Sequence, residues 1–219
     1  VSAGSVRGLL LRPGLLAYFA YPYLLMAFGG AYNELFLVYV ALFSASSLAF
    51  VLSIVSIDPD RLRGQFGARF APRAVGWSLV GFGALLALLW LGRILPALLT
   101  GKTPPGLDSD TTLFVQAGDL GIIIPAAVLA GILLMRRWAI GYLLSAVMLV
   151  NASTFGLALL AMAASMTAAG VRVAPMEVVI FSVLAVVFLV STAHTLLSVR
   201  APIRSEAGAR PGGLTLRPR

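Results

Sequence analysis

The chain has 219 residues, of which 60% are hydrophobic and only 11% are charged, and its mean hydropathy is +0.98. An average soluble domain carries about 25% charged residues, so this composition excludes a soluble globular protein and indicates membrane-spanning segments. The net charge of +8 comes mainly from arginines between apolar runs, with no basic face interleaved with stacking aromatics, so we expect no nucleic-acid partner.

Six apolar runs follow one another along the chain, and each is long enough for the ~20 residues that a helix needs to cross ~30 Å of hydrocarbon. Because backbone groups in lipid must bond within their own segment, each run predicts a helix. The sequence therefore predicts an all-α fold, a polytopic transmembrane helix bundle of six spans within residues 1–199. The predicted spans are residues 14–32, 35–57, 75–99, 113–135, 138–165 and 175–199.

The first run, residues 14–32, also has two features of a signal peptide: basic residues precede it, and small residues occur near Ala27 and Gly29. Its apolar region exceeds the usual 7–15 residues, so a membrane span is the favoured interpretation. The chain starts with Val1 and the run follows at once, which leaves open whether further spans upstream are missing.

Basic residues alternate between the two sides of the predicted bundle. Thirteen of the sixteen lie on the side that carries both termini, whereas the other side takes only Lys102 and Arg172, and Arg93 lies inside the third run. By the positive-inside rule, we expect both termini to be cytoplasmic and the protein to lie in the plasma (inner) membrane.

The loop after the second span, DPDRLRGQFGARFAPR, predicts a short interfacial helix over about residues 59–71. Asp58 is a suitable N-cap, and a proline follows at the first helical position. Leu62, Phe66 and Phe70 recur every four residues and would form an apolar face on the inner leaflet. The alternative is a plain connecting loop, since two glycines weaken the helix.

Basic residues in this loop and in the C-terminal tail predict contacts with anionic lipids of the inner leaflet, each worth about 1 kcal/mol near the surface. The tail, residues 200–219, is rich in Pro, Gly and Arg without a periodic apolar face, which predicts a disordered cytoplasmic segment. No pattern in the sequence identifies a protein partner. The loop arginines are Arg61, Arg63, Arg69 and Arg73.

Polar residues in or beside membrane spans are energetically costly, and those of this chain cluster at the predicted outer ends. Because four different helices place ionisable groups at a similar depth, they predict a polar site near the outer leaflet for a small solute or an ion. The candidate site residues are Asn33, Glu34, Arg93, Gln116, Asp119 and Glu177.

Asp119 has two interpretations, which depend on where its helix begins. A start near Thr112 places it about 10 Å along the helix axis, on one face with Gln116, where Arg93 of the preceding span is a partner at matching depth. A start at Leu120 makes Asp119 an N-cap whose carboxylate binds backbone N–H groups. A helix that starts at Leu120 would be short for a membrane span, which favours the start near Thr112. A structural role is nevertheless the simpler explanation for a charge at a helix end.

Polar groups deeper in the spans are expected to bond between helices. Tyr18, Tyr21 and Tyr23 surround Pro22, where a polar pocket is the alternative, and Asn151 lies in the middle of the fifth run. Small residues predict close helix packing, at four-residue spacing in the second run and along a similar face in the fifth. They are Ala41, Ala45 and Ala49, and Ala158, Ala161 and Ala164.

Several kinds of chemistry have no residues to support them. The chain has no cysteine, and its one histidine, His194, has no second histidine or carboxylate one turn away, so we expect no metal or haem. The last span has no lysine for a retinal Schiff base, and no nucleotide-binding, zinc-protease or nucleophile-elbow motif occurs. We therefore expect no enzyme activity and no cofactor.

The segments AFGGAYNELFLVYVALFSASSLAF, ILPALLTGKTPP and VQAGDL together resemble a family of uncharacterised bacterial multi-pass integral membrane proteins with no assigned activity. The resemblance covers most of the chain. It implies spans before the first run, motif-like positions at Asn33–Glu34 and at Gln116 and Asp119, and no catalytic residue.

Two functions follow as hypotheses. The first is a small-solute or ion transporter with a polar site near the outer leaflet. The alternative is a non-transport membrane module, namely a sensor, an assembly factor or an accessory subunit, in which the same polar groups only lock or cap helices.

Overall fold

The computed structural model describes residues 5–104, 107 and 112–200, and every regular element in this part of the chain is a helix. The helices are α1 (Val6–Phe28), α2 (Phe36–Val55), α3 (Pro59–Gly64), α4 (Pro72–Thr100), α5 (Phe114–Gly118), the π-helical segment η1 (Asp119–Ile123), α6 (Ile124–Met135), α7 (Ala139–Ala168) and α8 (Pro175–Leu197).

Within the described residues, six helices are long and apolar enough to cross a membrane. They are α1, α2, α4, the continuous helix Phe114–Met135, α7 and α8. Large apolar side chains cover their outer surface: Leu88 and Leu98 of α4 are each 71% exposed, as expected for side chains that face lipid. The prediction of an all-α bundle with six spans is confirmed, and these helices indicate an integral membrane protein.

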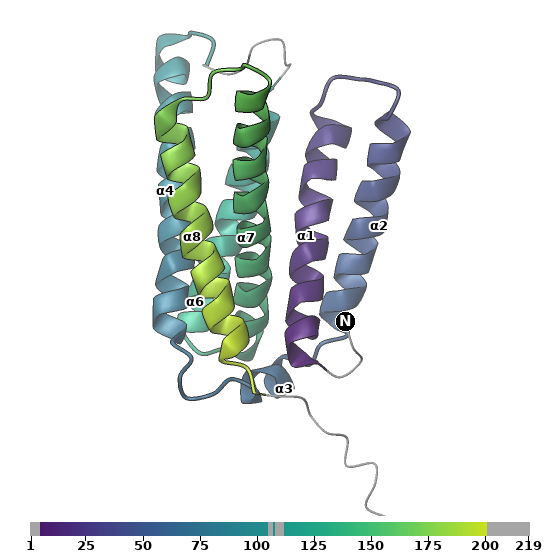
Figure 1. The fold of residues 1–219 in the computed structure, drawn as a ribbon, viewed down its shortest axis with the longest axis vertical. Coiled ribbons are helices and arrows are strands. Elements are labelled where there is room, and N and C mark those ends of the chain that lie inside the picture. The colour runs from purple at the N-terminus through teal and green to yellow at the C-terminus, as the bar shows by residue number, and fades with distance from the viewer. Residues whose placement is uncertain (1–4, 105–106, 108–111, 201–219) are drawn as a thin grey trace, which may run out of the picture.

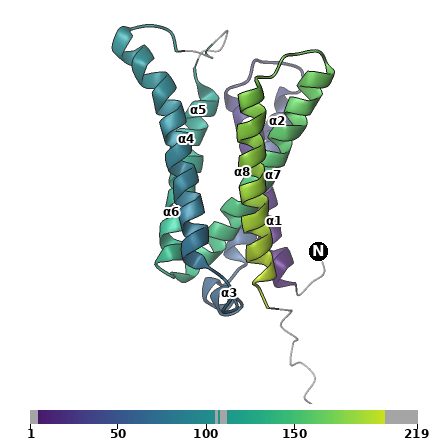
Figure 2. The same ribbon diagram turned by 60° about the vertical axis from the view of Figure 1, so that its left-hand side comes forward.

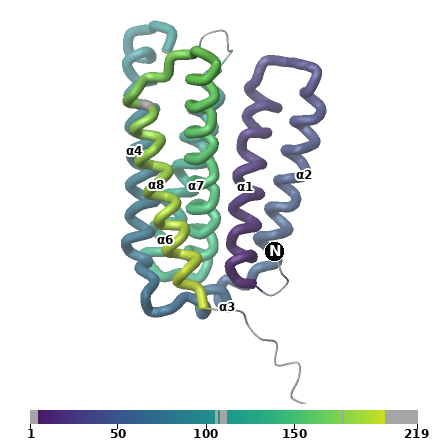
Figure 3. The backbone as a smooth tube through the Cα atoms, viewed as in Figure 1, coloured from purple at the N-terminus to yellow at the C-terminus, as the bar shows by residue number. Residues whose placement is uncertain are grey.

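The long helices are arranged around α7 (Figure 1). The hairpin of α1 and α2 stands on one side of α7, with α2 outermost (Figure 3), while α4 and α6 form a second antiparallel pair and α8 packs along α7. The start of α1, the end of α8 and the short helix α3 lie at the same end of the bundle. Toward the opposite end, α4 and α8 diverge (Figure 2).

Glycines set the closest helix contacts. A Cβ atom on Gly131 of α6 would come within 2.6 Å of the carbonyl oxygen of Gly76 in α4, and one on Gly156 of α7 would lie 3.0 Å from Ala185 Cα in α8. The alanine faces of the second and fifth runs were predicted to pack against other helices, and this is wrong at four positions. Ala41 and Ala45 are exposed, and so are Ala161 and Ala164. Regular spacing of alanines did not reveal which helix face meets a neighbour.

The first span is displaced from the predicted residues 14–32. The helix begins at Val6, where the Ser5 hydroxyl oxygen accepts a hydrogen bond from the Gly8 N–H at 3.5 Å, and it ends at Phe28. Arg12 therefore lies inside the helix, and its guanidinium donates to serine hydroxyls of α2. The buried residues Val6 and Leu10 explain the earlier start, because packing against neighbours stabilises this first part of the helix. The other five spans differ from their predicted bounds by at most three residues at each end.

The helix predicted over residues 59–71 forms only as α3, Pro59–Gly64. The Asp58 carboxylate caps it as expected and accepts from the N–H groups of Asp60 and Arg61 at 3.0 and 3.2 Å. After Gln65 the chain leaves the helix, because it pairs with the end of α8: Gly67 N–H donates to the Ser198 carbonyl at 2.9 Å.

The apolar face of that segment contacts protein. Leu62 and Phe70 are buried, and the ring of Phe66 lies 5.0 Å from that of Tyr142 in α7. Phe70 also stacks on His194 of α8, with ring centroids 6.0 Å apart. The expectation that this apolar face lies on the lipid is therefore wrong. These side chains instead hold α3 and the segment after it against α7 and α8. The predicted disordered tail lies outside the described residues, apart from Arg200.

Candidate functional site

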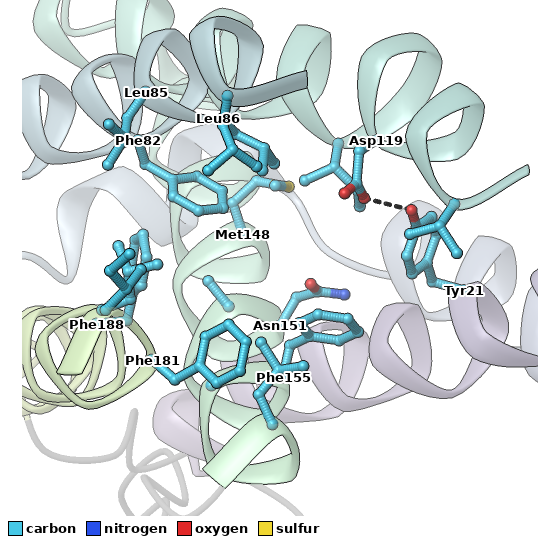
Figure 4. Close-up of a pocket in the computed structure, with 18 of the residues that line it drawn as sticks. Tyr21, Phe82, Leu85, Leu86, Asp119, Met148, Asn151, Phe155, Phe181 and Phe188 are labelled. Atoms are coloured by element: carbon cyan, nitrogen blue, oxygen red, sulfur yellow. Dashed lines mark hydrogen bonds between the residues drawn. The ribbon is translucent and has the colours of Figure 1, made fainter. Parts of the chain in front are cut away.

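A cavity of about 300 Å³ lies inside the bundle, between α1, α4, η1, α7 and α8 (Figure 4). Its wall is formed mainly by aliphatic and aromatic side chains, and Asp119 is the one charged residue among the described residues that line it. The volume falls at the lower end of the ~300–1,000 Å³ that ligand pockets occupy, so the cavity suits a small molecule.

Residues spaced one helical turn apart supply the walls. Phe82, Leu86 and Leu89 line the cavity from α4, and Leu184 and Phe188 line it from α8. The rings of Phe82 and Phe188 meet edge to face, with centroids 4.9 Å apart. Since α4 begins and α8 ends at the α3 end of the bundle, this aromatic pair forms the part of the cavity wall nearest that end.

Asp119 starts a π-helical segment inside a continuous membrane helix. The helix begins at Phe114, which places Asp119 in the second turn, about 7–8 Å along the axis at 1.5 Å per residue. The widened turn precedes Pro125, which has no N–H to donate and whose ring crowds the carbonyl four residues back. The alternative of an N-cap at Asp119 is wrong, because the helix has already begun and the carboxylate binds other helices.

The Asp119 carboxylate links three helices. The Tyr21 hydroxyl of α1 donates to Oδ1, the bond drawn in Figure 4, and the Trp90 indole N–H of α4 donates to Oδ2 at 2.9 Å. Gly118 permits the close approach, because a Cβ at this position would lie 2.9 Å from the Tyr21 hydroxyl oxygen. Tyr21 is buried, and its ring also meets that of Phe155 at 6.2 Å.

Arg93 does not pair with Asp119, although the interpretation with the earlier helix start offered it as a partner at matching depth. Its guanidinium lies over the ring of Trp90, 5.8 Å from the centroid, and its side chain is exposed. In the part of the chain that is described, the salt bridge found is the one between Arg61 and Asp58. Two neutral donors, Tyr21 and Trp90, bind the carboxylate in place of an arginine.

The remaining predicted site residues do not gather at the cavity. Asn33 and Glu34 are exposed in the turn before α2, where the Asn33 side chain accepts from the Leu35 N–H at 2.9 Å. Gln116 is half-buried and does not line the cavity. Glu177 lies in the first turn of α8, and its side chain is outside the described part.

Asn151 lies in the middle of α7, as the sequence indicates, but without the interhelical hydrogen bond expected of it. It is only 8% exposed, yet its side chain makes no hydrogen bond with any described residue, so the predicted interhelical bond is absent there. In Figure 4 its amide lies between Phe155 and the pair of Asp119 and Tyr21, at the cavity wall. An amide on a cavity wall without a protein partner leaves donors and an acceptor for a ligand or water.

No group of three or more His, Cys, Asp or Glu side chains in the described ranges could hold a metal ion. A comparison with known protein families, curated proteins and solved structures finds no match for this chain. The resemblance to bacterial membrane proteins therefore stays an expectation, and the function rests on the geometry of the cavity.

Proposed function

We propose that the chain is a small transporter of lipophilic cations, with Asp119 as the counter-charge in its cavity. The observation that carries the proposal is a carboxylate on an apolar cavity wall, with no described Lys or Arg within the 4.0 Å of an ion pair. A buried charge is costly unless it is paired, and the two neutral donors leave its charge uncompensated. A bound cation supplies the positive charge that compensates the carboxylate.

The aromatic lining supports a cation with an apolar body. Tyr21, Trp90 and Phe155 present rings near the carboxylate, and a cation over such a ring gains about 0.5–2 kcal/mol. The leucines and phenylalanines farther along the cavity suit the hydrocarbon part of the same solute. The proposed activity is binding and translocation, without chemistry on the solute.

The shape of the bundle supports a transport cycle. Phe82 and Phe188 are in contact at the α3 end of the cavity, whereas α4 and α8 diverge toward the other end of the bundle. We propose that separating this aromatic pair opens the second side. The distribution of basic residues supports both termini in the cytoplasm and a plasma-membrane location, so that the divergent end faces outward.

A second candidate rests on the links of Asp119 to α1 and α4. Because one carboxylate ties these helices to η1, it can serve only as a lock in a non-transport module, such as a sensor, an assembly factor or an accessory subunit. In that case the cavity needs no ligand, and Asp119 contributes to stability alone.

The test uses benzyltrimethylammonium and its neutral carbon analogue, neopentylbenzene, which share shape but differ in charge. Binding to the purified full chain carrying Trp77→Phe and Trp138→Phe is followed by the fluorescence of the remaining tryptophan, Trp90, which contacts Asp119, and uptake is measured in proteoliposomes. We expect the cation to bind at least about tenfold tighter than the neutral analogue, as a charge-assisted contact implies. Asp119→Asn should remove this preference and the uptake.

A thermal unfolding measurement on each variant separates the two candidates. Asp119→Glu keeps the charge, so it should retain part of the preference for the cation over the neutral analogue. It is the second variant to use if Asp119→Asn folds poorly. Binding without uptake would support a sensor, and equal affinity for both probes would contradict the cation site. A loss of thermal stability in Asp119→Asn, with no uptake by the wild type, would support the lock.

A further inference from the structure

A second cavity, of about 270 Å³, lies at the α3 end of the bundle, away from Asp119. Its walls come from the end of α3 and the segment that follows it, the start of α4, the turn between α6 and α7, and the start of α7. Two arginines, Arg63 and Arg137, line it, and no described acidic residue does. Neither arginine forms a salt bridge in the described part of the chain, so both charges are available to an anion.

The backbone of Arg137 is unusual for an arginine. Its φ is 58°, in the left-handed region, and it follows the end of α6 in a turn where Trp138 N–H donates to the Leu133 carbonyl at 3.0 Å. Glycine is the usual residue at this position, since a side chain costs free energy there. The turn cannot relax easily, because Gly141 already lies against the backbone of Leu133. A strained position that carries an arginine indicates that the side chain has a use.

Tyr142 supplies a neutral donor to the same cavity. Its side chain is only 7% exposed, and the centroid of its ring lies 5.0 Å from that of Phe66 and 5.7 Å from that of Phe70. It lines the cavity, and its hydroxyl makes no hydrogen bond with a described residue. The hydroxyl is nevertheless accessible from the cavity. In the described part of the chain, the only side-chain polar atom that is both fully buried and without a hydrogen-bond partner is Nε2 of His194, so the Tyr142 hydroxyl is not fully buried.

The start of α4 adds a third feature. Pro72, its first residue, lines the cavity, and Ala71, which precedes it, provides no side-chain cap. A 29-residue helix therefore begins here with first-turn N–H groups that no side chain satisfies. Such a helix start attracts anions through these N–H groups and the helix dipole.

We infer that this cavity binds a phosphate group, held by Arg63, Arg137, Tyr142 and the N-terminal turn of α4. Arginine forks, a hydroxyl and a free helix start are the donors that phosphate oxygens favour. The cavity is about nine times the ~30 Å³ that one water takes up in the liquid, so the phosphate can belong to an anionic lipid headgroup or be free in solution. This site does not depend on the function proposed for Asp119.

The test uses the full chain, purified and delipidated in a neutral detergent. Its thermal unfolding is followed with increasing phosphatidylglycerol, with a diacylglycerol of the same acyl chains that has no phosphate, or with inorganic phosphate. The dependence of the midpoint on ligand concentration gives each affinity. Arg137→Gly removes one guanidinium, and Arg136→Gly is its matched control, since Arg136 has an ordinary helical backbone and does not line the cavity.

We expect phosphatidylglycerol, but not diacylglycerol, to raise the midpoint, and Arg137→Gly to weaken that affinity about tenfold or more, as loss of a charged hydrogen bond implies. Arg136→Gly should change it less than about twofold. Without ligand, Arg137→Gly should unfold no earlier than the wild type, because glycine suits a φ of 58°. Tyr142→Phe should also weaken the affinity.

The two sources of phosphate are separated by the third titration. Stabilisation by phosphatidylglycerol alone assigns the site to a lipid headgroup, and stabilisation by inorganic phosphate as well assigns it to free phosphate. Equal effects of diacylglycerol and phosphatidylglycerol, equal losses in the two arginine variants, or no stabilisation by any phosphate would overturn the inference.

Discussion

Tyr21 and Asp119 lie 98 positions apart in the sequence, yet the tyrosine hydroxyl donates directly to the aspartate carboxylate. Trp90 donates to the other carboxylate oxygen at 2.9 Å, so that α1 and α4 are both joined to η1 through one side chain. The carboxylate is thereby fixed on the cavity wall, which is a requirement both for binding a cation and for locking the helices.

Removing the Tyr21 hydroxyl should have a modest effect on stability. Interhelical hydrogen bonds in membrane proteins contribute about 0.6 kcal/mol on average and up to about 1.7, so we expect Tyr21→Phe to lower the free energy of unfolding within this range. Tyr18→Phe is the control, because Tyr18 contacts Phe155 through its ring and makes no side-chain hydrogen bond with described residues. Unfolding in mixed micelles measures both variants, and equal losses would contradict the assigned bond.

The same link should depend on Gly118. A Cβ there would lie 2.9 Å from the Tyr21 hydroxyl oxygen, so Gly118→Ala should displace the phenol and destabilise the protein by about 1–3 kcal/mol, as other overpacked positions do. Gly121 is the matched control, since nothing lies within 4 Å of a Cβ built on it. Gly121→Ala should be neutral or stabilising by up to about 1 kcal/mol. A neutral result for Gly118→Ala in thermal unfolding would refute the close contact.

The sequence predicted the fold well, because hydrocarbon leaves the backbone few options. Length and hydropathy were sufficient for six helices, and five of them end within three residues of the expected positions. The first helix differs because its start, around Val6 and Leu10, is stabilised by packing against other helices. Hydropathy alone does not report such contacts.

The site was predictable only in part. Asp119 was identified because a charge inside an apolar run is costly, and it does line the cavity. The hydrogen-bond partners of Asp119 were not identified, because the depth of a residue in the membrane does not determine which side of its helix it lies on. Arg93 lies at a suitable depth, but its guanidinium stacks on Trp90 instead. Aromatic donors such as Tyr21 carry no charge, so they give a weaker signal in the sequence than an arginine.

Asn151 should contribute little to stability, in contrast to a nearby serine on the same helix. Its amide has no described partner, so Asn151→Ala removes no hydrogen bond and should lower the free energy of unfolding by less than the ~0.6 kcal/mol of an average interhelical hydrogen bond. Ser153 shares a hydrogen bond of 2.8 Å with Thr192 of α8, and Ser153→Ala should cost about 0.6 kcal/mol or more. The larger, apolar Asn151→Leu should take up part of the cavity and weaken binding of benzyltrimethylammonium. Unchanged binding in that variant would place the ligand elsewhere.

Because the chain has no cysteine, single cysteines can report which end of the bundle faces the cytoplasm. Ala68 is exposed beyond α3, at the end with the excess of basic residues, and Ala31 is exposed in the turn between α1 and α2 at the opposite end. The positive-inside rule predicts that a membrane-impermeant maleimide labels Ala31→Cys in intact cells, and labels Ala68→Cys only after the membrane is opened. Mass spectrometry of the labelled chain measures both. The reverse pattern would invert the bundle and place the end at which α4 and α8 diverge on the cytoplasmic side.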